Sequence, residues 1–300
     1  MFIIQYRKLF VGISIGLVLA SALALGVFGL KPSIDFTGGT LTEVSKGTLT
    51  QVVLEATVEG IVNHDVSIRP TDTSYIVRAQ EITPDTIALI ESTLVTIDPT
   101  AVIERVSTIG PSLGDELFQK ALIAIALVSF GIMIFVAIAF WKVSKPVSSW
   151  VYGLVTLGTL LHDVLIPAGV FALLGAFLNV EVDALFVVAL LTVLGYSVND
   201  TIVVMDRIRE NLRVNLELGK HEDFERTVGK SLTQTYARSI NTSLTTILVL
   251  LALFFFGGSA TEDFALALLL GVGAGAYSSI FFASPLLVMI GEGTKSKKSS

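Results

Sequence analysis

Six long apolar runs, separated by polar segments, are the main feature of the sequence. The first is an uncharged run from Leu9 to Leu30. A transmembrane helix needs about 20 predominantly apolar residues, and runs of this kind supply them. The pattern therefore predicts an α-helical polytopic membrane protein with six transmembrane helices. The later runs are Ala121–Trp141, Val147–Leu174, Ala184–Met205, Ser239–Phe256 and Phe264–Ile290.

The segment between the first two runs, residues 31–120, has short apolar alternations and turn signals instead. Its order of strand, helix, two strands, helix and strand is that of the ferredoxin-like α+β fold. We therefore expect a small separate domain between the first and second spans. The expected strands are Asp35–Val44, Val66–Arg69, Tyr75–Ala79 and Ala101–Ile109, and the expected helices are Leu49–Ile61 and Pro84–Val95.

Paired glycines interrupt the first of these strands at Gly38 and Gly39. Glycine inside a strand indicates a bulge or the close approach of another backbone segment. Because the pair follows shortly after the first span, we expect Asp35, Gly38 and Gly39 to act as a hinge of the domain.

Composition agrees with a membrane protein, since 52% of the residues are hydrophobic and only 15% are charged. About a quarter of a globular protein is charged. The net charge of −6 argues against nucleic acid as a partner. There is no cysteine, the three histidines (His64, His162 and His221) are scattered, and no nucleotide-binding or hydrolase motif is present. We therefore expect no metal, no cofactor and no enzymatic activity.

Lysine and arginine are distributed unevenly among the segments that join the runs. Loops 175–183 and 257–263 carry only acidic charges, whereas the other short segments carry basic ones. Cytoplasmic loops are enriched in lysine and arginine, so both termini are expected in the cytoplasm and residues 31–120 outside. The basic residues are Arg7, Lys8, Lys142, Lys145, Arg207, Arg209, Arg213, Lys220, Arg226, Lys230, Lys295, Lys297 and Lys298.

These patterns divide the chain into four parts. Residues 1–30 hold the cytoplasmic amino end and the first span, and residues 31–120 form the external domain. Residues 121–290 hold the other spans, and residues 291–300 form a cytoplasmic tail. Within the third part, residues 206–230 are mixed in charge and are expected to form an amphipathic helix on the cytoplasmic membrane surface.

A carboxylate, Asp200, lies inside the fourth expected span. Ionisable residues at membrane depth are costly and are functional candidates by default. Tyr196 and Ser197 share its helix face at spacings of four and three residues, and Asn199 is adjacent to it. This group is the first candidate site.

A polar stripe enters the fifth span and carries Arg238 at a depth comparable with that of Asp200. An ion pair between Asp200 and Arg238 is the simplest interpretation. Alternatively, Arg238 extends to the headgroups, and a neutral Asp200 bonds to a neighbouring helix. The stripe comprises Ser231, Gln234, Thr235, Arg238, Asn241, Thr242 and Thr245.

Two further features lie inside expected spans. His162 and Asp163 are midway along the third span, where they either extend a proton path or form a structural hydrogen bond between helices. Gly271 and Gly275 form a GxxxG pattern in the sixth span, which indicates close helix packing.

Four motifs, in order, resemble those of the SecF subunits of the bacterial SecDF protein-export complex, and the similarity extends over nearly the whole chain. A single Gly-Gly pair is a weak signal, but four motifs in one order and topology are specific. They are DFTGGT at Asp35–Thr40, IGPSLGDEL at Ile109–Leu117, GYSVNDTIVV and DRIREN within Gly195–Asn211, and SLTQT at Ser231–Thr235 with Arg238 beyond it.

The resemblance implies a six-span half of the RND transporter superfamily and use of the proton gradient in late protein export. Asp200 would carry the proton, with Arg238 as its charged partner; Na⁺ stays open as the driving ion. Supporting polar roles would fall to Tyr196, Ser197, Asn199, His162, Asp163, Gln234, Asn241 and Thr242.

The resemblance also implies partners and a location. SecD is the expected other half, and the SecYEG translocon, YajC, membrane lipid and the unfolded polypeptide are further expected partners. The implied location is the bacterial cytoplasmic membrane. In the RND drug pumps of the same superfamily, the fourth span carries a pair of Asp residues. This chain has Asn199 beside Asp200 instead, which disfavours drug efflux. A small-solute transporter and a structural assembly subunit with a static Asp200–Arg238 bridge remain as alternatives.

Overall fold

The computed structural model describes residues 2–64, 66–71, 73–80, 82–141, 147–220 and 222–296. Lys142, Lys145, His221, Lys297 and Lys298 lie outside the described residues. The chain divides into two compact units. The first comprises Met1–Leu30, Ile123–Ala176 and Phe186–Ser300, and the second comprises Lys31–Leu122 and Phe177–Leu185.

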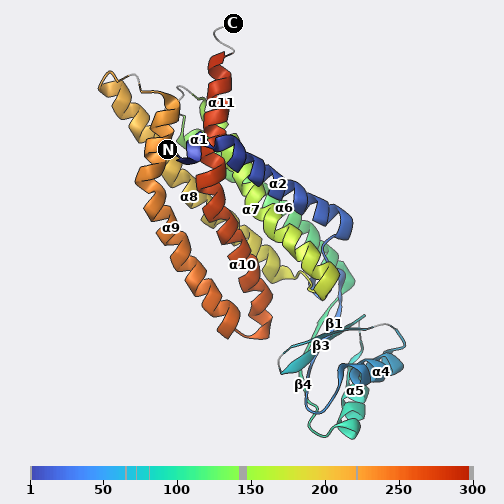
Figure 1. The fold of residues 1–300 in the computed structure, drawn as a ribbon. Helices are drawn as coiled ribbons and strands as arrows, with labels where there is room; N and C mark the ends of the chain where they lie inside the picture. Colours follow the sequence, from blue (N-terminus) through green and yellow to red (C-terminus); the bar gives the residue numbers. More distant parts are fainter. Residues whose placement is uncertain are drawn as a thin grey trace. The chain divides into compact units, whose positions relative to one another are not determined.

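Six helical segments of the described chain are long and apolar enough to cross a membrane, as the apolar runs predicted. In the last of them, α10 (Ser259–Ser278), a π-helical turn η1 (Ser279–Ala283) and α11 (Ser284–Ser296) form one continuous rod (Figure 1). A short helix, α1 (Phe2–Gln5), precedes the first span. The other spans are α2 (Arg7–Phe28), α6 (Pro111–Ala139), α7 (Ser149–Leu178), α8 (Ala184–Glu217) and α9 (Phe224–Phe256).

The prediction of a separate surface helix over residues 206–230 is wrong. Helix α8 continues without a break to Glu217, and α9 begins at Phe224. The apolar period continues past the end of the expected span, because Ile208 and Leu212 are buried in the same core as Val204. Charge pairs along the helix, such as Arg209 with Asp206 at 2.7 Å, occupy its outer side. The mixed composition therefore reflects the ends of two helices, α8 and α9, that extend beyond their apolar runs.

The main core of the first unit lies where α8 and α9 approach the turn that joins them. Ile4 of α1, Tyr152 of α7, Ile208 of α8 and Leu232 of α9 are all nearly inaccessible to solvent there. Small residues let the helices approach closely at other levels. A Cβ atom added to Gly275 would lie 3.0 Å from the Cβ of Ser197, and one on Gly271 would collide with the Val193 side chain. These contacts confirm the packing role predicted for the GxxxG pattern.

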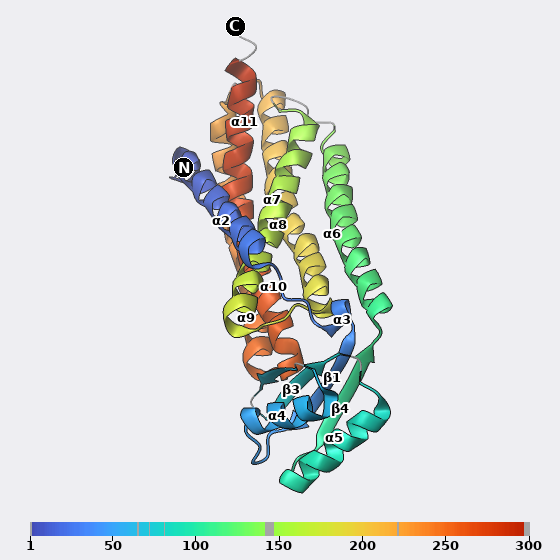
Figure 2. The ribbon, with the colours of Figure 1, turned by 90° about the vertical axis from the view of Figure 1, so that its right-hand side faces the viewer.

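The second unit is built around a four-stranded antiparallel sheet in the order β2-β3-β1-β4. Helices α4 and α5 supply Leu54 and Leu94 to a core with Val44 and Val77 of the sheet. Figure 2 shows both helices beside the sheet. The ferredoxin-like prediction is thereby confirmed. The elements are β1 (Gly39–Ser45), α4 (Gln51–Val62), β2 (Ser67–Pro70), β3 (Ser74–Ala79), α5 (Pro84–Ile97) and β4 (Ile103–Ile109).

The first predicted strand, Asp35–Val44, begins later than expected. Residues Ile34–Thr37 form one helical turn, α3, and the strand starts only at Gly39. Ser33 caps the turn, since its Oγ accepts a hydrogen bond from the amide of Asp35 at 3.2 Å. Side chains such as that of Ser33 favour helix starts by satisfying a free N–H group.

Asp98 ties together two loops at one end of the sheet. One carboxylate oxygen accepts hydrogen bonds from the amide (2.6 Å) and hydroxyl (2.7 Å) of Thr48, and the other from the amide (2.9 Å) and hydroxyl (2.6 Å) of Thr100. These hydrogen bonds lower the pKa of Asp98 well below its ordinary range. The bonds from the Thr100 and Thr48 hydroxyls contribute most, and those from the two amides contribute less. These bonds stabilise the ionised carboxylate in the folded domain.

Asp98→Asn is expected to destabilise the domain at neutral pH. Because the folded-state pKa is depressed, the stabilisation is present above the unfolded-state value of about 3.9 and is lost as the pH falls below it. The wild-type and Asp98→Asn proteins should therefore differ at pH 7 and converge in acid. The labelling rate of a cysteine placed at buried Val58 measures domain opening, and Asp85→Asn on exposed α5 is the control. Equal labelling rates at pH 7 would contradict this role.

Candidate functional site

Asp200 lies on the side of α8 that faces α9. Its side chain is buried, with 5% exposure, and its Oδ2 atom accepts a hydrogen bond from Ser243 Oγ at 3.2 Å. Ser239, one turn earlier on α9, is also buried, and its hydroxyl has no hydrogen-bond partner within the described residues. The carboxylate therefore contacts small hydroxyl side chains in an otherwise apolar part of the bundle.

The expected ion pair between Asp200 and Arg238 is not formed. Among the described residues, no lysine or arginine nitrogen lies within 4 Å of the Asp200 carboxylate, although Arg238 is on the adjacent helix α9. Arg238 is exposed, whereas the next residue, Ser239, faces α8. Successive residues on a helix point about 100° apart, so α9 turns its hydroxyl side chains to Asp200 and its arginine away.

A ladder of hydrogen bonds continues along the interface between α8 and α9. Tyr196 donates from its hydroxyl to the carbonyl oxygen of Thr242 and to Thr246 Oγ1, both at 3.0 Å. Gln234 Oε1 accepts from Arg207 Nε at 2.7 Å and from Asn211 Nδ2 at 2.8 Å. Two of the predicted supporting residues, Tyr196 and Gln234, thus join the helices on either side of Asp200.

Other predicted polar residues lie outside this interface. Asn199 on α8 and Asn241 on α9 are exposed, as is Arg238. Asn199 and Asn241 lie in the apolar runs that the sequence assigns to the membrane, and Arg238 lies one residue before the second of these runs. Among the described residues, Asn199, Arg238 and Asn241 leave their polar side chains uncovered, and we name them the exposed polar face.

A second buried carboxylate of the helical unit, that of Asp163 on α7, has no accessible surface. It lies 2.8 Å from His162 Nδ1 and accepts hydrogen bonds from Ser197 of α8 and from Ser278 of α10, the latter at 2.8 Å. The expected structural hydrogen bond between helices is therefore present. Ser278 and Ser243 were not among the predicted site residues, because isolated serines in apolar runs give no strong sequence signal.

The segment that carries DFTGGT is bound to the start of α8. Asp35 Oδ2 accepts a hydrogen bond from the amide of Ala184, the first residue of that helix, at 2.9 Å. The adjacent Val182 pairs with Pro32 in a short parallel bridge. Glu181, which is almost fully buried, forms ion pairs with Arg78 of β3 and with Lys31 at 3.6 Å. The pKa of Lys31 is lowered, mainly because the ammonium group is partly buried and also because the positive charge of Arg78 is near it.

Gly38 and Gly39, for which a hinge role is predicted, form a tight junction in this structure. Their φ angles are 73° and 132°, which residues with a Cβ atom adopt only with strain. An added Cβ would lie 2.6 Å from Pro111 Cα at Gly38, and 2.6 Å from the carbonyl oxygen of Ala79 at Gly39. Both positions therefore require glycine for space as well as for conformation.

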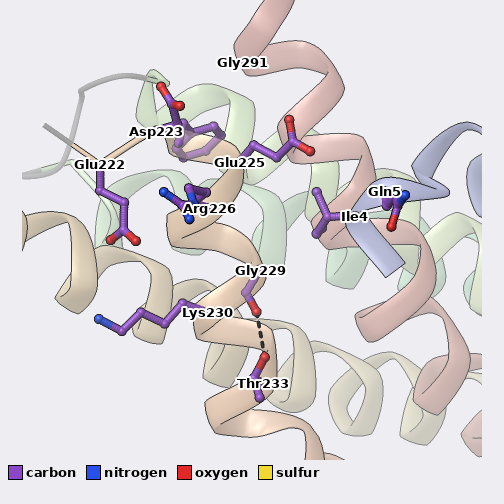
Figure 3. A pocket seen from close by; sticks show the side chains of 11 residues that line it. Ile4, Gln5, Glu222, Asp223, Glu225, Arg226, Gly229, Lys230, Thr233 and Gly291 are labelled. Atoms are coloured by element: carbon purple, nitrogen blue, oxygen red, sulfur yellow. Dashed lines mark hydrogen bonds between the residues drawn. The ribbon is translucent and has the colours of Figure 1, made fainter. Parts of the chain in front are cut away.

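A hollow of about 770 Å³ lies at the end of the bundle where α9 begins (Figure 3). Its lining is mixed in charge, with Glu222, Arg226 and Lys230 among its residues, and Ile4 contributes from α1. None of its residues belongs to the Asp200 or Asp163 groups. The hollow is therefore a feature separate from the intramembrane polar residues.

Comparison with known proteins decides the family. The model "Protein export membrane protein SecD/SecF, C-terminal" matches residues 89–293, and the "SecD/SecF GG Motif" model matches residues 23–45. The SecF translocase subunit of Thermobaculum terrenum is 40% identical, over 95% of this chain and 92% of its own length. The chain belongs to the SecF group of the SecD/SecF family.

Membership of the SecF group agrees with the fold. The crystal structure of SecDF from Thermus thermophilus superposes with a TM-score of 0.84 and 31% identity, over 97% of this chain and 38% of the SecDF chain. A second SecDF structure, in a super-membrane-facing form, gives a TM-score of 0.71 over 39% of its length. The chain is accordingly a multi-pass membrane protein and a transport protein, not an enzyme.

Replacing both Gly38 and Gly39 with valine is expected to impair protein export while the protein still reaches the membrane with its partner. Each residue would be forced into a strained backbone region at a cost of about 1–3 kcal/mol, besides the collisions. The measurement is the export rate of a secreted reporter in cells that depend on the variant. Gly60→Val is the matched control, because Gly60 lies in open space on α4. Full activity of the double variant would leave the pair without a mechanical role.

Proposed function

We propose that this chain couples the proton gradient to late steps of protein export, as a subunit of the Sec translocase together with SecD. The observation that carries the proposal is the setting of Asp200, a buried carboxylate in a membrane span. It accepts a hydrogen bond from Ser243 and has no cationic side chain within 4 Å among the described residues. A carboxylate in this setting is functional by default. The similarity to SecF proteins, which are protein translocase subunits, supports the export assignment.

The physical basis of coupling is the change in charge at Asp200. An ionised Asp200 attracts Arg238, which lies within electrostatic range on the adjacent helix, whereas a protonated one does not. Protonation would therefore change how α8 and α9 pack. One charge that crosses 100 mV contributes about 2.3 kcal/mol, which is enough to shift a two-state equilibrium substantially.

The link to the external domain would be the hydrogen bond from Ala184 to Asp35. Helix α8 begins at Ala184 and carries Asp200 further along. A carboxylate stabilises a helix start because it meets free N–H groups there. A shift of α8 would thus be transmitted to the DFTGGT segment. Asp35, Gly38 and Gly39 then act as a coupling junction.

SecD is the proposed cover for the exposed polar face. A guanidinium and two carboxamides in the membrane-spanning part of a helix are costly against lipid. SecDF of Thermus thermophilus is 37% identical over 90% of this chain but is much longer, with 36% of its length matched. A second six-span half is thus expected beside α8 and α9. SecYEG, YajC, lipid and the exported polypeptide are proposed as further partners.

The proposed location is the bacterial cytoplasmic membrane, with both termini in the cytoplasm. The support is the distribution of basic residues, which are absent from loops 175–183 and 257–263. In the proposal, the amino end of residues 1–30 and the tail of residues 291–300 lie in the cytoplasm. Residues 31–120 form the external domain, and residues 121–290 hold the other five spans. Residues 206–230 then form the cytoplasmic ends of α8 and α9.

Asp200→Asn is expected to assemble normally with SecD and to lose gradient-dependent export. Asparagine keeps the shape and the bond to Ser243 but cannot carry a proton. At 100 mV the loss can reach roughly 50-fold, which corresponds to one charge moved across the membrane. Export in inverted vesicles, with and without a proton gradient, measures it. Na⁺ in place of the proton gradient identifies the driving ion.

Conservative variants separate a proton carrier from a static bridge. Asp200→Glu should retain some activity because the carboxylate survives. Arg238→Lys should be less damaged than Arg238→Met, since a charge remains. Wild-type export by an assembled Asp200→Asn protein would end the proton-carrier proposal and leave a structural role.

A photocrosslinking residue placed at Asn241 is expected to react with SecD. The control position is Leu127 on α6, which is 66% exposed and lies in an apolar run. Crosslinked SecD is detected by its mass after purification of the complex. A SecD adduct from position 127 and none from position 241 would contradict the proposed contact face.

Cysteine labelling tests the proposed orientation, since the chain has no native cysteine. A cysteine at Thr73 should react with a membrane-impermeant reagent in intact spheroplasts, and one at Ser296 should react only after lysis. Labelling is read as a mass shift on the isolated protein. The reverse pattern would overturn the orientation.

A further inference from the structure

The polar cluster around Asp163 is built from three spans and is separate from the Asp200 site. His162 and Asp163 come from α7, Ser197 from α8 and Ser278 from α10. None of these side chains has more than 1% exposure. A hydrogen bond to Asp163 alone would account for helix packing, but two further observations point to more than packing.

The first observation is the unpaired nitrogen of His162. Its Nδ1 atom is engaged with Asp163, but its Nε2 atom is buried and has no hydrogen-bond partner in the described part of the chain. The ring stacks between Tyr277 and Phe282, at centroid distances of 6.1 and 5.4 Å. A buried polar atom without a partner is rare and needs a reason.

The second observation is the π-helical turn η1, which begins immediately after Ser278. Consecutive hydroxyls at its start reach two different targets: Ser278 donates to Asp163, and Ser279 Oγ lies 3.1 Å from Thr201 Oγ1 on α8. Single π-helical turns are uncommon and occur frequently at functional sites. Here the wider turn brings both serines against α7 and α8.

Charge balance indicates what the cluster binds. No lysine or arginine contacts Asp163 among the described residues, so an ionised Asp163 beside a neutral His162 leaves one buried negative charge. One proton on the pair removes that charge, whether it resides on the imidazole or on the carboxyl group. The pair is therefore suited to bind and release a single proton.

We propose that His162 and Asp163 form a second proton-binding site, coupled to Asp200 through α8. Ser197, which donates to Asp163, and Asp200 lie three residues apart on one face of that helix. Tyr277 on α10 is the titratable group stacked against the His162 ring, and Asp200 lies on α8 one turn after Ser197, with its carboxylate turned to α9. The coupling deepens the function proposed for Asp200, but proton binding at the pair can be measured without export.

Nitrogen NMR of the His162 ring tests the proposal on the full-length chain, ¹⁵N-histidine-labelled and combined with unlabelled SecD in lipid bilayers. His64 and His221 are replaced by asparagine so that one histidine remains. The ring signals should titrate between about pH 5 and 9. If the two sites are coupled through α8, Asp200→Asn should move the midpoint to lower pH, because the negative charge of Asp200, which favours protonation of the pair, is removed.

Two further variants keep the outcome decisive. Ser278→Ala should raise the midpoint by about one unit, since a donor to the ionised carboxylate is lost. Thr159→Val is the matched control, because this buried hydroxyl on α7 bonds only to carbonyl oxygens of its own helix, and it should leave the midpoint unchanged.

A His162 ring that does not titrate, or a midpoint that Ser278→Ala leaves in place, would overturn the second site. If His162 titrates but Asp200→Asn leaves its midpoint unchanged, the coupling between the two sites is overturned. If Asp200→Asn loses export and the His162 ring signals do not titrate, this inference is overturned and the proposed function is left intact. Titration of His162 with normal export by Asp200→Asn would do the opposite.

Discussion

The burial of polar side chains between membrane-spanning helices is the constraint on which the first unit depends. No water is available in the bilayer core, so a buried polar group there needs a partner on its own helix or on a neighbouring one. Tyr196 with Thr242, Asp200 with Ser243, Asp163 with Ser278 and Thr201 with Ser279 all meet this requirement. Such pairs fix the rotation of α8 against α7, α9 and α10, because a helix turned by one residue would strand several polar groups at once.

Helix α8 is the common element of these contacts. Ser197 and Thr201 contact α7 and α10, and Tyr196 and Asp200, on the adjoining part of the same face, contact α9. Its first amide bonds to Asp35 of the DFTGGT segment. A change of charge on α8 therefore acts on side chains of three neighbouring helices and on the DFTGGT segment. A subunit that couples protonation to movement needs contacts of this kind.

The difference between the two ionisable residues follows from the same constraint. Asp200 can be buried because a hydroxyl satisfies it, whereas an arginine with five donors finds too few acceptors on these helices. Arg238 lies instead on the exposed polar face with Asn199 and Asn241. Within this family, a face of that kind agrees with a chain that functions beside a second membrane half.

The sequence by itself determined the six spans, the ferredoxin-like order of elements and the group of polar residues inside the membrane. These depend on local period and composition, and each is visible within a short window of the chain. Only the tertiary structure decided that α8 and α9 continue through residues 206–230, that Ile34–Thr37 forms a helical turn, and that Arg238 faces away from Asp200. It also supplied Ser243, Ser278 and the bond from Ala184 to Asp35. These features depend on helix rotation and on contacts between distant segments, which no local pattern encodes.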